Sequence, residues 1–351
     1  MLKLNHQNKE KVYGWGRSTH SNSYVFRPKN IDAIRQTIEL AKQKNVKISN
    51  KAAGKSYGDN TLNDEQIVLD ISQMNKIIHW NPNSGIIEAQ AGATIEKILL
   101  NCVESGWVFP VMPGTRFVTI AGCLGNNVHG KNALHQGYIG EHVLSFKVLL
   151  ASNDLLECSR DKNSDLFFSV ISGLGLIGVI TDVTIQMRKV PSFYVCGKAN
   201  RYPNIAQLIE QYEKIKYDYE YSIAWVDAIK PGESIGRGEI NYGNFINDND
   251  YSIRDHKIPD KLFGVLPNSL MPTLGKVFLN RFTMKLINSL QYNTGGMSSD
   301  VQENKVSLSK YHYLMDMKFP HYNYFFRSGF FLYQPILPID KSIEGYEKLI
   351  K

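Results

Sequence analysis

Long hydrophobic runs, repeats and low-complexity segments are all missing from this sequence of 351 residues. No apolar stretch approaches the roughly 18 residues that a membrane-spanning helix needs. The opening MLKLNHQNKEK also lacks the apolar core of a secretion signal. We therefore expect a protein that is soluble or peripheral to a membrane, with a cytoplasmic location.

Cysteine is scarce, and the four cysteines are far apart at positions 102, 123, 158 and 196, with no C-x-x-C pair. This spacing favours neither a zinc site nor a disulfide framework. The plain interpretation is buried thiols in a reducing compartment. We expect no bound metal.

Clusters of like charge are missing as well, although the balance is basic. Forty Lys and Arg residues against 33 Asp and Glu give a net charge of +7, but the basic residues are scattered. Nucleic-acid binding has no recognisable module behind it. A phosphorylated ligand or an anionic membrane face remains compatible with the charge. The 43% hydrophobic content is that of an ordinary folded protein, and the length indicates two domains or one with an insertion.

Helical and strand patterns alternate in the first half of the chain. Asn30 and Thr94 are expected N-caps of two amphipathic helices, the second ending at Gly106. Alternating or β-branched runs predict strands near residues 46–49, 67–71, 86–90, 143–151, 155–158 and 176–187. This half is expected to have an α+β fold.

The second half is rich in aromatic residues and begins near Pro191. Its strand-like runs, such as YSIAWVDAI, predict an antiparallel domain. We expect two domains, residues 1–190 and 191–351. A last helix is expected with Ser342 as its cap, and it reaches Lys351 without a glycine cap or other stop signal. The second domain is therefore expected to be incomplete at its C-terminus.

Three glycine-rich segments lie at junctions between elements: residues 53–60 (AGKSYGDN), 113–132 (PGTRFVTIAGCLGNNVHGKN) and 173–178 (GLGLIG). Successive backbone N–H groups in such turns form anion sites, and glycine permits the close approach of a phosphate. The third segment matches G-x-G-x-x-G, but it precedes a strand instead of a helix, which argues against a Rossmann site. We predict that the three segments converge on one dinucleotide.

These segments resemble the vanillyl-alcohol-oxidase type of FAD flavoproteins, and within it the branch that oxidises polyprenyl-phosphate ribose. GWGR at residues 14–17, YSIAWVDAI at 221–229 and SGFFLYQPILP at 328–338 extend the resemblance along the chain. It implies a two-subdomain PCMH-type FAD-binding domain followed by an antiparallel-sheet substrate domain. Members of this family continue beyond the point that matches Lys351, where they supply a lysine and a cysteine to the site. We therefore expect either a fragment or a shortened relative.

The resemblance also implies which residues hold FAD. Many relatives carry a histidine that bonds covalently to the flavin where this sequence has Tyr57, so we expect non-covalent FAD. The cofactor-binding positions implied are Ala53, Gly54, Lys55, Ser56, Tyr57, Gly58, Asn60, Pro113, Gly114, Thr115, Arg116, Thr119, Gly122, Cys123, Asn126, His129, Gly130, Asn132, Gly175, Gly178 and Ile180.

Oxidation of a secondary alcohol needs its hydride-donating carbon over flavin N5 and a base for the hydroxyl proton. The resemblance implies that His129, Lys131 and Tyr57 are catalytic. It places Lys131, Trp225, Tyr311 and Gln334 at the substrate. The alternatives are a satisfied core histidine, a surface lysine and ordinary aromatic or polar core.

The implied function is oxidation of the ribose 2-hydroxyl of a polyprenyl-phosphate ribose. A reductase partner would complete epimerisation to arabinose for the cell envelope, and peripheral contact with the inner membrane face would suit such a substrate. Two alternatives stay open. One is an aldonolactone or alditol oxidase, and the other is an inactive flavin-binding protein.

Overall fold

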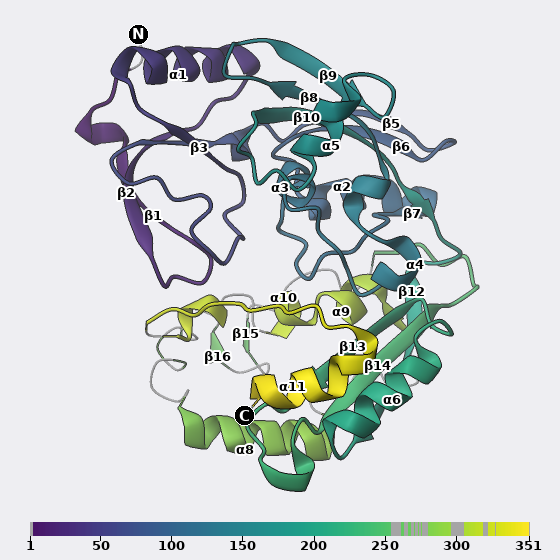
Figure 1. Cartoon of the computed structure of the whole chain (residues 1–351). Helices are drawn as coiled ribbons and strands as arrows, with labels where there is room; N and C mark the ends of the chain where they lie inside the picture. The colour runs from purple at the N-terminus through teal and green to yellow at the C-terminus, as the bar shows by residue number, and fades with distance from the viewer. Residues whose placement is uncertain are drawn as a thin grey trace. The chain divides into compact units, whose positions relative to one another are not determined.

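The computed structural model describes residues 3–253, 261–262, 266–267, 270, 273, 275, 280–295, 305–318, 322–326 and 328–350. The chain forms two compact units (Figure 1). Unit 1 is Met1–Gly130, Gly137–Lys189 and Ser328–Leu332. Unit 2 is Lys131–Gln136, Val190–Arg327 and Tyr333–Lys351.

The first sheet of unit 1 has four strands in the order β1-β2-β4-β3. They are β1 (Lys9–Tyr13), β2 (His20–Phe26), β4 (Ile67–Asp70) and β3 (Ile48–Lys51). β4 pairs in parallel with both β2 and β3, while β1 is antiparallel. Parallel strands need a crossover, and α1 (Ile31–Lys44) supplies it between β2 and β3.

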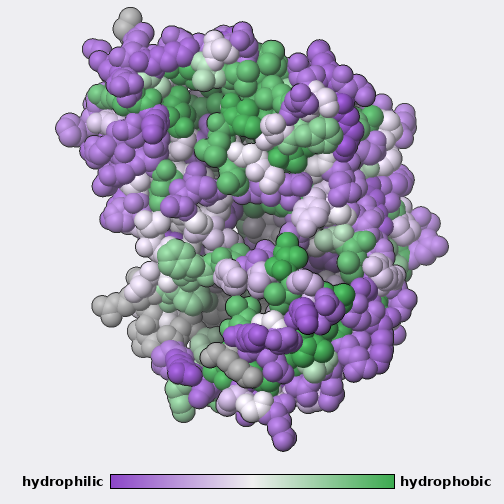
Figure 2. Space-filling view, viewed as in Figure 1, coloured by the Kyte–Doolittle hydropathy of each residue, from purple (hydrophilic) through white to green (hydrophobic). Residues whose placement is uncertain are grey.

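Helix α1 forms as its sequence predicts. The side chain of Asn30 accepts a hydrogen bond from the Ala33 N–H, and Asn45 ends the helix in the left-handed conformation. Ile34 and Ile38 are buried, whereas hydrophilic side chains gather over the top left of Figure 2, where Figure 1 places α1. The amphipathic pattern therefore fixes which side of α1 faces the sheet.

The second sheet of unit 1 is antiparallel, in the order β5-β6-β10-β8-β9. Its strands are β5 (Ile77–Asn81), β6 (Ile86–Gln90), β10 (Val179–Gln186), β8 (Val143–Leu149) and β9 (Leu155–Ser159). All but β5 were expected from the sequence. The remaining elements of this unit include α2 (Ile95–Cys102), α3 (Ile120–Gly125), α5 (Ser164–Val170) and the pair β7 (Trp107–Val108) and β11 (Arg188–Lys189). Thr94 caps α2, and Gly106 adopts the left-handed conformation after it.

Unit 2 contains a four-stranded antiparallel sheet in the order β13-β14-β12-β17. The strands are β13 (Tyr221–Val226), β14 (Gly238–Phe245), β12 (Tyr194–Tyr202) and β17 (Lys305–Ser307). Helix α6 (Ile205–Ile215) packs against one face through a cluster centred on Leu208, Ile240 and Tyr242. Because side chains alternate along a strand, the opposite face carries a different set of residues.

The other elements of unit 2 are α4 (Ala133–Gln136), β15 (Lys261–Leu262), β16 (Leu266–Pro267), α8 (Arg281–Thr294), α9 (Leu308–His312), α10 (Leu314–Lys318) and α11 (Ser342–Ile350). α11 lies where the sequence predicts a helix. Ser342 is its first residue, and its hydroxyl donates to the Ile339 carbonyl. No helix within the described ranges is both long and apolar enough to cross a bilayer.

The four cysteines are free thiols, but the expectation that all of them are buried is wrong for Cys196. Cys102, Cys123 and Cys158 are buried, while Cys196 on β12 is exposed. Burial raises the pKa of the Cys102 thiol to about 12 and raises that of Cys123 as well. These two thiols are packing residues that stay protonated near neutral pH.

Candidate functional site

The first glycine segment, residues 53–60, follows β3 and contacts the GWGR stretch at residues 14–17. The Trp15 N–H donates to the Ser56 carbonyl at 2.8 Å. A Cβ on Gly14 would lie 2.3 Å from the Gly58 carbonyl oxygen, so only glycine permits this approach. GWGR therefore supports the first segment, a role that its sequence alone did not reveal.

The third segment, residues 173–178, is joined to the strand that precedes the first. The Asn50 amide on β3 donates to the carbonyls of Gly175 and Gly178 at 2.7 and 3.1 Å. Leu174 and Gly175 both have positive φ, of 53° and 76°. A leucine in this conformation is strained, and tertiary contacts must hold it there. Asn50 is thus a positioning residue that the glycine patterns did not single out.

The second segment meets the third at the end of α3. The Leu174 N–H donates to the Gly125 carbonyl at 2.8 Å. Thr119 caps α3 by accepting from the Gly122 N–H at 3.3 Å. The second and third glycine-rich segments therefore meet in unit 1, and Asn50 ties the third to the strand before the first. We call residues 53–60, 113–130 and 173–178 the loop cluster, and their convergence on one dinucleotide stays a prediction.

Arg116 has a structural environment inside this cluster. It is buried, its Nε lies 3.4 Å from the Glu96 carboxylate, and its guanidinium stacks on Phe117. Lys55 also engages aromatic rings, with Nζ 3.5 Å from the centre of the Trp15 ring. Both cations shape the walls of the cluster.

The loop cluster fits a flavin dinucleotide. The space beside Gly58 and Gly114 is open, since a Cβ on either residue would meet no atom within 4 Å. The Asn60 Oδ1 atom is buried and has no hydrogen-bond partner among the described residues. Leu176 and Ile177 on the third segment are exposed apolar side chains. A buried polar atom without a partner, open space beside two glycines and uncovered apolar side chains suit a ligand with a polar chain and an apolar ring system.

The other predicted cofactor positions are divided between the two units. Tyr57 packs edge-on against Phe330, with ring centres 5.5 Å apart, and His129 packs similarly against Tyr138. Cys123 and Ile180 are buried in the core of unit 1. Asn132 belongs to unit 2, where its carbonyl accepts from the His135 N–H.

Lys131 is half-buried in unit 2, and its polar atoms contact two elements. Its carbonyl accepts from the Ser222 N–H on β13 at 3.1 Å. Its Nζ donates to the carbonyls of Tyr311 and His312 on α9, at 3.2 and 2.9 Å. Burial lowers the pKa of Lys131 to about 8. A surface lysine is thereby excluded.

Tyr311 packs on the sheet face that α6 leaves uncovered. Its ring centre lies 6.0 Å from that of Tyr221, and a Cβ on Gly243 would be 3.1 Å from its hydroxyl oxygen. That hydroxyl is buried and finds no partner within the described part of the chain. Burial raises the pKa of Tyr311. The phenol therefore stays protonated and can donate a hydrogen bond.

The same face carries a row of polar residues, which we call the polar sheet face: Arg201, Trp225, Glu239 and Asn241. Pairing places Trp225 and Arg201 opposite Glu239 from its two neighbouring strands. Glu239 is buried, 3.4 Å from the Arg201 Nε, and it accepts from the Asn241 amide at 3.2 Å. The Asn241 Oδ1 atom is buried without a partner in the described ranges. Glu239 and Asn241 were missed because polar residues alternating along a strand usually face water.

Gln334 is exposed in unit 2, on the segment that follows Leu332. Its substrate role stays a prediction.

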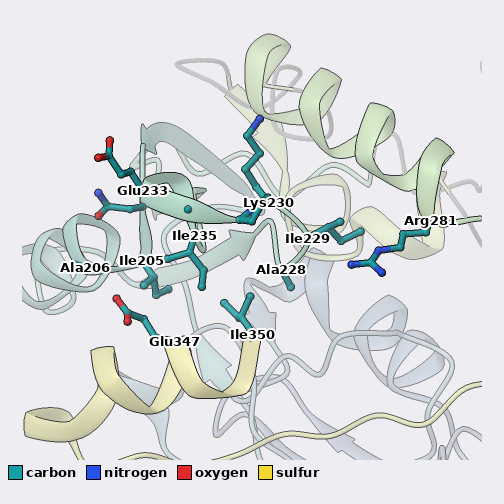
Figure 3. A pocket seen from close by; sticks show the side chains of 13 residues that line it. Ile205, Ala206, Ala228, Ile229, Lys230, Glu233, Ile235, Arg281, Glu347 and Ile350 are labelled. Carbon is teal, nitrogen blue, oxygen red and sulfur yellow. The ribbon is translucent and has the colours of Figure 1, made fainter.

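A pocket of about 700 Å³ lies elsewhere in unit 2, between α6, α11 and residues 228–235. In Figure 3 the carboxylates of Glu233 and Glu347 lie on the left, the Lys230 amine at the top centre and the Arg281 guanidinium on the right. None of the residues predicted from the sequence lines this pocket. It is therefore separate from the polar sheet face.

Comparison with known proteins gives two kinds of match. Residues 22–159 match a family model described as an FAD-binding domain. Decaprenylphosphoryl-beta-D-ribose oxidase of Mycolicibacterium smegmatis is 28% identical over 346 residues, which is 97% of this chain and 74% of that protein.

Matches to lactone oxidases are shorter. A putative D-arabinono-1,4-lactone oxidase of Neurospora crassa is 27% identical over 51% of this chain and 31% of its own length. L-gulonolactone oxidase of Mus musculus is 26% identical over 54% of this chain and 41% of its own length. The chain thus spans less than half of these two relatives.

Proposed function

We propose a substrate and a reaction for this chain from the premise that it is an FAD-dependent oxidoreductase acting on CH–OH groups, with residues 22–159 as its FAD-binding domain. FAD is its cofactor, and its fold is α+β. The substrate that we propose is a polyprenyl-phosphate ribose, oxidised at the 2-hydroxyl. A keto-sugar reductase would then complete an epimerisation to arabinose.

One observation carries this proposal. The match to the decaprenylphosphoryl-ribose oxidase covers 97% of the chain and so includes unit 2, where Lys131, Trp225 and Tyr311 lie. The matches to lactone oxidases cover about half of the chain. Substrate choice depends on the groups that contact the substrate, so the longer match favours the lipid-linked sugar.

We assign the base to Lys131. A neutral amine has two hydrogens, and the carbonyls of Tyr311 and His312 would accept both. Its lone pair would then be free to accept the proton of the sugar hydroxyl. The pKa of about 8 allows a sizeable neutral fraction near physiological pH. Tyr311, with its buried hydroxyl, would donate to a sugar oxygen.

The remaining roles rest on the resemblance to the vanillyl-alcohol-oxidase type. Bound FAD supplies the acceptor for the hydride equivalent that leaves the sugar carbon. We propose that His129 and Tyr57 border the flavin and that Gln334 contacts substrate. Because Tyr57 stands where many relatives carry the linking histidine, we propose non-covalent FAD. Release of the yellow colour on acid precipitation would agree with this.

The finer organisation is also a proposal. We assign residues 1–190 to a two-subdomain PCMH-type domain, with one sheet of unit 1 in each subdomain, and residues 191–351 to the substrate domain. A cytoplasmic location with peripheral contact at the inner membrane face would suit the lipid-linked sugar.

The test is anaerobic reduction of the flavin in the purified full chain. Polyprenyl-phosphate ribose should bleach the flavin absorbance, while free alditols and aldonolactones should not. Bleaching by a lactone alone would favour the second candidate, an aldonolactone oxidase, which the shorter matches to lactone oxidases support. Bound FAD that no sugar reduces would favour an inactive flavin-binding protein.

A further inference from the structure

Helix α8 in unit 2 is amphipathic, but its apolar side faces outward and its polar side faces the rest of the unit, the reverse of an ordinary surface helix. Four large apolar side chains point outward: Phe282, Leu286, Ile287 and Leu290 are 78%, 56%, 45% and 54% exposed. Phe282, Leu286 and Leu290 follow one another at intervals of four residues, so they form a stripe along one side of the helix. We call these four residues the α8 stripe.

The inward side of α8 is polar and is fixed by specific bonds. The buried Asn288 amide donates to the Asp227 carboxylate at 2.7 Å. Arg237 donates to the Ser289 hydroxyl at 2.9 Å and stacks on Tyr292. Arg237 is itself held by Asp227, with 3.0 Å between their charged atoms. These contacts set the rotation of the helix, so the outward position of the stripe is built into the fold.

All charged side chains of α8 are positive. Arg281 and Lys285 are exposed, and the 14 residues of the helix include no Asp or Glu. A helix with an outward apolar stripe and flanking cations matches the pattern of helices that lie in the interface of an anionic bilayer. A protein partner would be an alternative, but the uniform sign of charge favours an anionic lipid surface.

The C-terminal end of α8 abuts the polar sheet face. Arg201 donates to the Asn293 carbonyl at 2.8 Å while also pairing with Glu239. A Cβ on Gly295, which ends the helix, would lie 2.6 Å from the Arg201 guanidinium. One residue therefore connects the end of the helix to the face that carries Trp225 and Glu239.

We propose that α8 is a membrane-docking helix whose stripe inserts into an anionic bilayer and so brings the polar sheet face close to lipid-linked substrate. Its part in substrate delivery rests on the proposed function, whereas bilayer binding does not. The two can therefore fail separately.

The experiment is co-sedimentation of the full FAD-loaded chain with vesicles of phosphatidylcholine containing phosphatidylglycerol. The variant Phe282→Ser/Leu286→Ser/Leu290→Ser should weaken binding by at least about tenfold, because it removes the apolar area that inserts. Arg281→Gln/Lys285→Gln should weaken binding by about 10- to 30-fold and reduce its dependence on salt. The matched control Ile78→Ser/Phe168→Ser removes two exposed apolar side chains from unit 1 and should bind as the parent does.

Activity separates the two proposals. The stripe variant should keep its rate on a short-chain, water-soluble sugar phosphate and lose it on the same sugar embedded in vesicles. Vesicle binding without any sugar oxidation would overturn the proposed substrate and leave the docking helix standing.

Three outcomes would overturn the docking helix. They are no binding to anionic vesicles, binding that the stripe variant leaves unchanged, and a parent dimer that the stripe variant converts to monomer. The last would show that a second copy covers the stripe. Size-exclusion chromatography of each variant measures it.

Discussion

The loop cluster of unit 1 and the polar sheet face of unit 2 are built from different parts of the chain. In the loop cluster, a backbone hydrogen bond joins the second and third glycine-rich segments, and Asn50 ties the third to β3, which precedes the first. On the polar sheet face, single side chains from neighbouring strands line up across the sheet. Cofactor binding by backbone leaves contiguous motifs in a sequence, whereas a side-chain site spread over strands leaves none.

The largest effect expected of any single change is at Lys131. Lys131→Met should lower the rate of flavin reduction by substrate about 100- to 1,000-fold, because it removes the proposed base. FAD content should stay that of the parent, since Lys131 belongs to unit 2. Rapid-mixing kinetics and flavin absorbance measure the two quantities.

Lys214→Met is the matched control, because Lys214 is exposed on α6 in an ion pair with Glu210. It should leave the rate unchanged. Loss of FAD from Lys131→Met would contradict the division between a cofactor site in unit 1 and a substrate site in unit 2, since one residue would then serve both.

Stability should depend on pH through the same lysine. The pKa of Lys131 is about 8 in the folded protein, below its value of 10.5 in an unfolded chain, so between these values the unfolded state binds more protons. The free energy of unfolding should therefore rise as pH increases from about 8 to about 10, by up to about 3 kcal/mol. Denaturant unfolding at several pH values measures it. In Lys131→Met this rise should disappear, and a rise that persists would assign it to other groups.

A smaller effect is expected at Asn50 in unit 1. Asn50→Ala leaves the Gly175 and Gly178 carbonyls without their donor and should cost about 1–3 kcal/mol of stability. FAD should bind about tenfold more weakly, because the third segment loses its link to β3. The exposed Asn83→Ala serves as the control. Unchanged FAD affinity, measured by fluorescence titration, would mean that the first and third segments do not act together.

The smallest effect on stability is expected at Tyr311. Because its hydroxyl has no partner among the described residues, Tyr311→Phe should change the free energy of unfolding by no more than about 0.5 kcal/mol. Tyr194→Phe should cost about 1 kcal/mol, because the Tyr194 hydroxyl donates to the Ser252 carbonyl. KM for the sugar should rise in Tyr311→Phe alone. A large loss of stability there would mark Tyr311 as ordinary core.

Part of unit 1 could be predicted from the sequence because its signals are local, although β1 and β2 were not expected. Asn30 and Thr94 cap helices as their positions indicate, and the hairpin of β8 and β9 follows from the turn at Asn153. β5 was missed because its residues are mostly exposed or half-buried and lack a clear alternation. The glycine segments predicted the loop cluster because a turn near a phosphate constrains each residue by itself.

The site residues of unit 2 were harder to predict from the sequence. Glu239 and Asn241 alternate with the buried Ile240 and Tyr242, which is also the pattern of a strand with one face in water. Only the burial of Glu239 together with that of Ile240 and Tyr242 shows that both faces of β14 are covered. Helix α8 was not expected from the sequence, and its apolar stripe lies on the exposed side of the helix instead of the side facing the core.

The exposure of a single thiol makes unit 2 chemically addressable. Cys196 on β12 is accessible to a maleimide, whereas Cys102 and Cys123 stay protonated and enclosed. Under conditions that keep the protein folded, a fluorophore should therefore attach at one place, Cys196 on the sheet of unit 2. Energy transfer from that dye to the bound flavin would then report how the distance between the two units changes when substrate or lipid is added.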